Sequence, residues 1–94
     1  MELAAAHITI FEAPVIELAS RRPRRRTDEL SPRELEVLQG LARGDRTEDM
    51  ATYLYLSTHT IRSHVKSVLR KLNARTRAHA VAIGYADGAL DLAA

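Results

Sequence analysis

The sequence predicts an all-α fold, in which four helices form one small bundle behind a short extended N-terminal arm. Two observations lead to this prediction. Between residues 30 and 92, apolar side chains recur with the 3.6-residue period of amphipathic helices, broken only by short polar segments. A Ser or Thr residue also stands before three of these apolar runs, at the position where it can cap a helix.

The composition excludes several classes of protein. The 94-residue chain contains no cysteine, so disulfide frameworks, zinc fingers and thiol catalysis are excluded. The N-terminus lacks the basic region of a signal peptide, and no apolar run approaches the length of a membrane span. We therefore expect a cytoplasmic protein that does not enter a membrane.

The first 29 residues form two segments that differ from the rest of the chain. Residues 1–20 form an apolar arm with β-branched clusters, which predicts one strand or a poor hairpin, and Pro14 argues against a long continuous element. Residues 21–29 form a linker that is rich in arginine and too charged to belong to a core. The helical domain is then expected over residues 30–94.

The first predicted helix opens with a specific start signal. Ser31 is a good N-cap, Pro32 suits the first helical position, and Glu34 completes a capping box. Gly44 is expected to end the helix in the left-handed conformation. The residues expected on its buried face are Val37, Leu38 and Leu41.

The next two predicted helices lie close together in the sequence. The second helix is expected over about residues 47–54, and either Asp45 or Thr47 could cap it. A tight turn at residues 55–56 separates it from a third helix, which Ser57 caps and which continues to residue 72. A short helix, a short break and a longer basic helix make a helix-turn-helix unit.

A fourth helix is expected to close the bundle. Thr76 caps it, it continues to about residue 86, and Gly88 ends it. Its close-packed side is predicted to hold Ala80, Val81 and Gly84. The first and fourth helices would then support the helix-turn-helix unit from two sides.

The third helix carries the pattern that points to a function. Residues 57–77 include six Lys or Arg residues and no Asp or Glu, in a chain whose formal net charge is only +2. On a helix, the apolar residues of this segment share one face and the polar residues share the other. The apolar set is Ile61, Val65, Val68, Leu69 and Leu72, and the polar set is His59, Arg62, Ser63, Lys66 and Arg70. A helix that enters the major groove of DNA needs these two faces, one for the core and one offering cations and hydrogen-bond donors.

A series of short motifs extends this pattern over residues 30–81. The motifs are Leu30-Ser31-Pro32-Arg33-Glu34, Val37-Leu38, Leu41-Ala42-x-Gly44, Met50-Ala51, Leu54-x-Leu56-Ser57, Thr60-Ile61-Arg62-x-His64, Leu69-x-Lys71-Leu72 and Arg75-x-Arg77-x-x-Ala80-Val81. In this order and spacing they resemble the LuxR/GerE-type DNA-binding domain of bacterial transcription regulators. The resemblance implies a four-helix LuxR-type helix-turn-helix bundle whose helix 57–72 reads the major groove of double-stranded DNA.

The resemblance also implies roles for individual residues, which we state as expectations. The expected base contacts are Arg62, Ser63 and Lys66. The expected contacts to the DNA backbone, or residues that position it, are Thr60, Arg70, Lys71, Arg75 and Arg77. The fourth helix is expected to form a two-fold dimer contact through Ile83 and Ala86. The chain would thus be a sequence-specific regulator of the bacterial nucleoid, a homodimer on DNA, with RNA polymerase or another regulator as a further partner.

Two features depart from the family pattern. Glu48 and Asp49 stand where many relatives carry a small polar pair and a lysine that approaches the DNA backbone, so we expect them to reduce DNA affinity or to face another partner. Most relatives also attach this domain to a receiver or ligand-binding domain, and the roughly thirty residues before it cannot contain either. We therefore expect a stand-alone regulator that is controlled by its abundance or by a partner.

The arginines of the linker leave two interpretations open. These residues are Arg21, Arg22, Arg24, Arg25 and Arg26. In one interpretation they form an arm that follows phosphates or enters the minor groove, as the basic N-terminal arms of other DNA-binding domains do. In the other they are a solubilising spacer.

Metal sites, cofactors and enzymatic activity are not expected. His59 and His64 are five residues apart and point to different faces of a helix, and no cysteine assists them. The sequence shows no phosphate-cradling glycine loop and no nucleophile with a suitable base. The alternative to a DNA-binding regulator is an adaptor or inhibitor that uses the helix-turn-helix scaffold to bind another component of the transcription machinery.

Overall fold

The computed structural model of the protein describes residues 24–91. Its elements are a 3-10 helix, η1 (Arg26–Glu29), and the α-helices α2 (Pro32–Arg43), α3 (Thr47–Leu54), α4 (Thr58–Leu72) and α5 (Arg77–Ala86). No strand occurs between residues 24 and 91, so the predicted all-α fold with four helices is confirmed. The predicted extended arm at residues 1–20 lies outside the described residues, as do Arg21 and Arg22.

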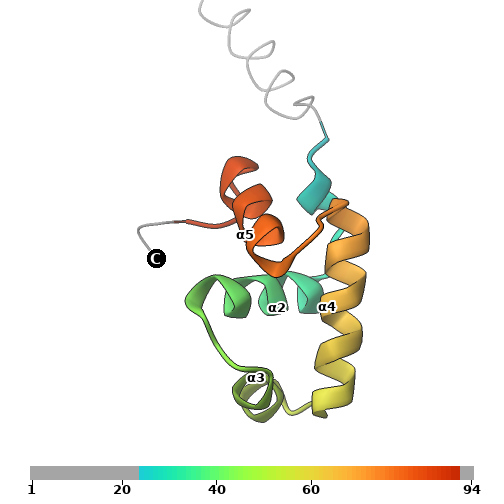
Figure 1. Cartoon of the computed structure of the whole chain (residues 1–94), viewed down its shortest axis with the longest axis vertical. Coiled ribbons are helices and arrows are strands. Elements are labelled where there is room, and N and C mark those ends of the chain that lie inside the picture. The colour runs from blue at the N-terminus through green and yellow to red at the C-terminus, as the bar shows by residue number, and fades with distance from the viewer. Residues whose placement is uncertain (1–23, 92–94) are drawn as a thin grey trace, which may run out of the picture.

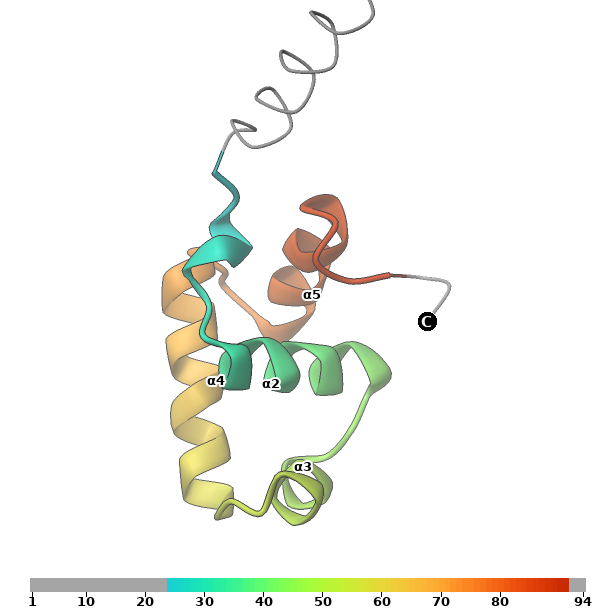
Figure 2. The ribbon, with the colours of Figure 1, turned by 180° about the vertical axis from the view of Figure 1, so that it is seen from behind.

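The helices are arranged around α2, which contacts both α4 and α5 (Figure 1). The long helix α4 runs along one edge of the bundle, and the short helix α3 packs beside its N-terminal end. α5 lies on the side of α2 away from α3. The view from behind shows that no other helix of residues 24–91 covers the outer side of α4 (Figure 2).

The start and the end of α2 follow from local sequence. The Ser31 side chain accepts a hydrogen bond from the Glu34 amide at 3.1 Å, and the Glu34 side chain accepts one from the Ser31 amide at 2.8 Å. Pro32 is the first helical residue, and Gly44 ends the helix with a φ of 82°, a conformation that glycine adopts without strain. The predicted capping box and the predicted glycine cap are both confirmed.

The start of α3 differs from the prediction. Arg46 occupies the N-cap position and its side chain makes no capping hydrogen bond, while Thr47 is the first residue of the helix. The Asp45 carboxylate accepts a hydrogen bond from the Tyr53 hydroxyl at 2.9 Å. The prediction that Asp45 or Thr47 caps this helix is wrong, because Asp45 makes a tertiary contact with the far end of α3 instead.

The cap of α5 is confirmed. The Thr76 side chain accepts a hydrogen bond from the His79 amide at 3.0 Å. On the packed side of the helix, Ala80 and Gly84 are buried and Val81 is half-buried. A Cβ atom on Gly84 would lie 2.6 Å from Leu90 Cδ1, so this position requires a glycine for the chain to fold back on the helix.

The hydrophobic core consists of two clusters that share α4. One cluster joins α4 to α2 and α5 and contains Leu38, Val68, Leu72, Ala80, Ile83 and Leu90. The other joins α4 to α2 and α3 and contains Val37, Met50, Ala51, Ile61 and Val65. The apolar face of α4 is therefore anchored along the whole helix, and its opposite face is held toward solvent.

Candidate nucleic-acid interface

The polar face of α4 is exposed from its first turn to its last. Arg62, Ser63, Lys66 and Arg70 are all exposed, and so is His59 at the start of the helix. The residues that face the core from the other side are Ile61, Val65, Val68 and Leu72, and each is buried. The predicted division of this helix into a core face and a polar face is confirmed.

The first turn of α4 presents hydroxyl groups and no carboxylate. The Ser57 hydroxyl accepts a hydrogen bond from the Thr60 amide at 3.0 Å, and the hydroxyls of Ser57 and Thr60 lie 2.9 Å apart. No acidic residue stands in this turn. The positive end of the helix dipole therefore remains without a carboxylate, which favours the approach of an anion such as a phosphate.

The positive charge on and after α4 is not compensated within the described part of the chain. Between residues 57 and 86, five exposed cations have no ion-pair partner among the described residues, and they are Arg62, Lys66, Arg70, Arg75 and Arg77. The sequence from residue 57 to residue 86 contains no Asp or Glu. These charges therefore create a positive potential over one side of the molecule, which attracts polyanions.

Lys71 was expected at the DNA backbone, but in the structure its side chain makes an ion pair inside the fold. Its Nζ lies 2.7 Å from Glu34 Oε1, and the side chain of Glu34 is only 6% exposed. Burial by itself raises the pKa of the Glu34 carboxyl, but the hydrogen bonds from Lys71 and Ser31 and the charge of Lys71 outweigh burial and lower the pKa below its usual value. A free phosphate contact through Lys71 conflicts with this ion pair, which joins the first turn of α2 to the last turn of α4.

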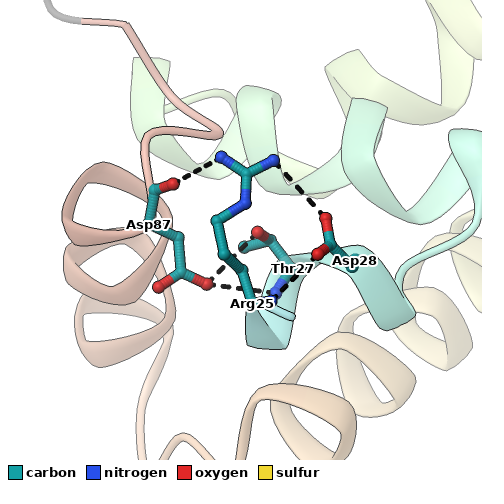
Figure 3. Close-up of polar contacts among 4 residues, drawn as sticks. All are labelled: Arg25, Thr27, Asp28 and Asp87. Atoms are coloured by element: carbon teal, nitrogen blue, oxygen red, sulfur yellow. Dashed lines mark hydrogen bonds and ion pairs between the residues drawn. The ribbon is translucent and has the colours of Figure 1, made fainter. Parts of the chain in front are cut away.

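Arg25 and Arg26, which were assigned to the linker, belong to the folded domain. Arg25 Nη1 donates a hydrogen bond to the carbonyl oxygen of Asp87 at 2.6 Å, and Arg26 Nη1 donates one to the carbonyl oxygen of Leu72 at 3.1 Å. The amide and the hydroxyl of Thr27 both donate to the Asp87 carboxylate at 3.2 Å (Figure 3). This network, which we call the η1 clamp, connects the C-terminal ends of α4 and α5.

The η1 clamp corrects the prediction for the arginine block. Arg25 and Arg26 donate to backbone carbonyl groups, and Arg24 forms an ion pair with Glu29 at 2.8 Å while staying 72% exposed. Arg25 and Arg26 are therefore neither a free DNA arm nor a solvated spacer. Sequence reasoning missed the clamp because Thr27 and Asp87 are 60 residues apart, and no local pattern marks such a pair.

Ile83, which was expected to form a dimer contact, lies in the core of the monomer. It is 9% exposed and packs in the cluster that contains Leu38 and Leu72. Ala86, the other expected contact, is exposed. The helix α5 turns Ile83 inward together with Ala80, so its burial in the monomer core conflicts with the expected contact to a second chain, whereas Ala86 stays exposed.

The two acidic residues that depart from the family pattern lie at the start of α3, as the sequence predicts. Glu48 and Asp49 stand in the first turn of the helix and both are exposed. Neither carboxylate has an ion-pair partner within residues 24–91. They stabilise the helix through its dipole and oppose the positive potential of α4.

The described residues contain neither a cluster of metal ligands nor a helix that could span a membrane. No group of three or more His, Asp or Glu side chains between residues 24 and 91 is placed to hold a metal ion. No helix in the same range is both long enough and apolar enough to cross a bilayer. His59 is exposed at the start of α4 and His64 is half-buried beside the core.

Known proteins match the region that forms the bundle. A family model described as bacterial regulatory proteins of the luxR family matches residues 28–83, which is more than half of the chain. The uncharacterized transcriptional regulatory protein YxjL of Bacillus subtilis strain 168 is 46% identical over 56 residues, which cover 60% of this chain and 26% of that protein. The nitrate/nitrite response regulator NarP of Escherichia coli K12 is 44% identical over 48 residues, 51% of this chain and 22% of that protein.

A third relative extends the match slightly further. The transcriptional regulatory protein ComA of Bacillus subtilis strain 168 is 38% identical over 63 residues, 67% of this chain and 29% of that protein. The chain thus spans less than a third of the length of these relatives. Because the match over residues 28–83 coincides with the helix-turn-helix bundle, the chain belongs to the luxR family of bacterial regulatory proteins, which are DNA-binding transcription regulators.

Proposed function

We propose that the protein is a sequence-specific transcription regulator that reads the major groove of double-stranded DNA with α4. The observation that carries the proposal is the exposed and uncompensated polar face of this helix, which two core clusters hold outward. In helix-turn-helix proteins, the N-terminal part of the second helix of the unit contacts base edges. In this chain that part presents Arg62, Ser63 and Lys66.

The chemistry of these three side chains suits base recognition. Arginine and lysine donate to the O6 and N7 atoms of guanine, and each good contact of this kind provides about 1–3 kcal/mol of discrimination against other bases. A serine hydroxyl donates or accepts, so Ser63 can contact several bases. Arg62 and Lys66 are one helical turn apart, about 6 Å along the axis. That distance spans roughly two base-pair steps.

The remaining free cations are proposed to bind the DNA backbone. Arg70, Arg75 and Arg77 are exposed and unpaired in the described residues, and Thr60 is held by Ser57 at the start of α4. Contacts from such residues to phosphates fix the register of a protein on DNA without reading its sequence. Lys71 is not included, because its charge is neutralised by Glu34.

Assembly and cellular context complete the proposal. The protein would bind as a homodimer through the exposed side of α5, which includes Ala86, with half-sites about one helical turn of DNA apart. Small side chains bury little area, so the dimer should be weak in the absence of DNA. The regulator would act without enzymatic activity in the bacterial cytoplasm, and it would change transcription through RNA polymerase or a second regulator.

The proposal is tested by mapping the DNA contacts directly. A binding site is selected from random duplexes with the full chain, and the selected duplex is then titrated into ¹⁵N-labelled protein. The amide signals of residues 57–66 should shift most, and those of Arg75 and Arg77 should also shift. Exposed residues at the start of α2, such as Arg33 and Glu36, should be unaffected. No binding to any duplex, combined with tight binding to a transcription protein, would instead support the adaptor interpretation.

A further inference from the structure

The short connection between α4 and α5 carries Arg75, which the proposed function places at the DNA backbone. The first amides of this connection are held by the end of α4. The Asn73 amide donates a hydrogen bond to the carbonyl oxygen of Arg70 at 3.1 Å. The Ala74 amide donates one to the carbonyl oxygen of Leu69 at 2.8 Å. The path of the chain is therefore fixed by α4 up to the residue before Arg75.

The Arg75 amide has a side chain as its partner. It donates a hydrogen bond to Nδ1 of His79 at 3.1 Å, and the His79 amide donates one to the Thr76 hydroxyl at 3.0 Å. His79 is the third residue of α5, as Glu34 is the third residue of α2. The Glu34 carboxylate accepts from the amide of its own N-cap residue, Ser31. The His79 imidazole instead accepts from the residue before the cap, one position further back.

The chemistry of this hydrogen bond fixes the state of the imidazole and limits what the bond can contribute. An imidazole nitrogen accepts only when it carries no proton, so His79 is neutral and its proton lies on Nε2. Arg75 and His79 are both exposed, so water can satisfy either group and the fold does not need the bond to satisfy a buried amide. Its effect is to restrict the backbone conformation of Arg75.

Restricting this backbone matters for a residue that binds a phosphate. Arg75 has no ion-pair partner within residues 24–91, so no other charged group of the described chain orders its side chain. A contact made by a flexible segment must overcome the loss of conformational entropy when the segment becomes ordered. A backbone that is ordered before DNA arrives lowers this cost and raises affinity.

We propose that His79 is a positioning residue for DNA binding, whose Nδ1 holds the backbone of Arg75 in the conformation that contacts a phosphate. The inference rests on the proposed function, which places Arg75 at the DNA backbone. His79 acts through Arg75 and does not itself need to contact DNA. A residue outside the basic face of α4 thereby contributes to affinity without contributing charge.

Two substitutions separate the acceptor atom from the rest of the side chain. In asparagine, Oδ1 is bonded to Cγ in the same way as Nδ1 of histidine, so His79→Asn keeps an acceptor at this position. His79→Leu places a methyl group there and removes the acceptor. Leucine also has a higher helix propensity than histidine or asparagine. A loss of DNA affinity in His79→Leu therefore cannot come from a weaker helix.

The hydrogen bond itself is tested without DNA, by NMR on the ¹⁵N-labelled full chain. The wild type should show a scalar coupling between the Arg75 amide nitrogen and His79 Nδ1. The Arg75 amide proton should exchange with solvent more slowly in the wild type and in His79→Asn than in His79→Leu. Urea denaturation should show that His79→Leu is no less stable than the wild type. Absence of the coupling, together with equal exchange rates in the three proteins, would overturn the inference.

The consequence for DNA is tested by fluorescence anisotropy on the selected duplex. His79→Leu should bind about threefold to tenfold more weakly than the wild type, as expected for the loss of one hydrogen bond. His79→Asn should restore the affinity of the wild type. In an Arg75→Ala background, His79→Leu should cause no further loss, because the residue through which it acts is gone.

Three results with DNA would also overturn the inference. Equal losses in His79→Leu and His79→Asn would show that the acceptor is not what matters. A loss from His79→Leu that persists in the Arg75→Ala background would make His79 an independent DNA contact. Unchanged affinity in Arg75→Ala would show that there is no phosphate contact to position. Failure of the wild type to bind any duplex is a different outcome, since it would contradict the proposed function and the inference with it.

Discussion

The side chain of Lys71 lies on the DNA-reading helix but is used in an ion pair within the fold. Its ammonium group neutralises a carboxylate that is 6% exposed, and it connects two helices that are distant in the sequence. Lys66, five residues earlier, has no such partner in the described part of the chain. Two lysines of the same helix therefore have separable roles, one in stability and one in recognition.

Lys71→Ala should reduce the free energy of unfolding by roughly 2 kcal/mol, because it leaves Glu34 buried without its counter-charge. Its DNA affinity should be unchanged once the protein is folded. Lys66→Ala is the matched control and should show the opposite result, with normal stability and weaker DNA binding. Urea denaturation and fluorescence anisotropy measure the two quantities. A loss of DNA affinity in Lys71→Ala equal to that in Lys66→Ala would contradict the structural role.

The lowered pKa of Glu34 makes this contribution dependent on pH. The folded-state pKa lies below the unfolded-state value of about 4.3, so the stabilisation is complete above that pH and is lost as the pH falls through the folded-state pKa. The stability difference between the wild type and Glu34→Gln should therefore be largest near neutral pH and should shrink below about pH 4. Denaturation curves between acid and neutral pH measure it. A difference that stays constant over this range would show that the charge of Glu34 does not contribute.

Helix ends were predictable wherever the cap is purely local. Ser31, Ser57 and Thr76 each accept the amide that the sequence predicts, because both groups lie within one turn. Asp45 was mispredicted because its carboxylate has a stronger tertiary alternative, the Tyr53 hydroxyl together with the Arg43 guanidinium. Local sequence contains no signal for that competition.

The buried face of a helix was predictable when the pattern was long and amphipathic. The fifteen residues of α4 separate clearly into apolar and charged positions, so its two faces were assigned correctly. The ten residues of α5 are mostly apolar or small, and sequence alone could not decide whether Val81 or Ile83 lies deeper. Packing against α2 determines which of the two is buried: Ile83 belongs to the core and Val81 is only partly buried.

The salt dependence of DNA binding should distinguish the cations that contact phosphates from Lys71, which is paired with Glu34 within the fold. The slope of log K against log salt changes by about 0.9 for each phosphate contact that is lost. Arg70→Ala, Arg75→Ala and Arg77→Ala should each make the slope less steep by about this amount, whereas Lys71→Ala should not change it. Anisotropy titrations over a range of salt concentrations give the slope. An effect of Lys71→Ala as large as that of Arg75→Ala would place Lys71 at the DNA backbone after all.

At the scale of the described part of the chain, the η1 clamp joins the start of the bundle to the C-terminal ends of α4 and α5, and no sequence pattern predicted it. Charge asymmetry along the chain was visible in the sequence and correctly marked the positive side of the molecule. The pairing of Thr27 with Asp87 was not visible, because it depends on how α5 returns to the start of the bundle. Domain boundaries read from composition alone therefore placed the folded region a few residues too late.

Asp87→Ala should destabilise the bundle by roughly 1–2 kcal/mol, because the buried Thr27 loses the acceptor for both its amide and its hydroxyl. Thr27→Val should cost part of the same energy, and the double variant should cost less than the sum of the two single variants. Thermal and urea denaturation measure all three. Strict additivity would show that the two residues stabilise the fold independently, and that the clamp is not an energetic unit.

The central claim is that the exposed face of α4 reads DNA sequence. The most direct test compares the affinity of the wild type, Arg62→Ala and Arg33→Ala for the selected duplex and for a random duplex at physiological salt. The wild type should prefer the selected duplex by about a thousandfold or more. Arg62→Ala should reduce that preference by about tenfold or more while it retains most of its binding to random DNA. Arg33→Ala, which changes an exposed arginine on α2, should leave the preference intact. Equal wild-type affinity for the two duplexes, or an equal loss on both in Arg62→Ala, would contradict sequence reading by α4.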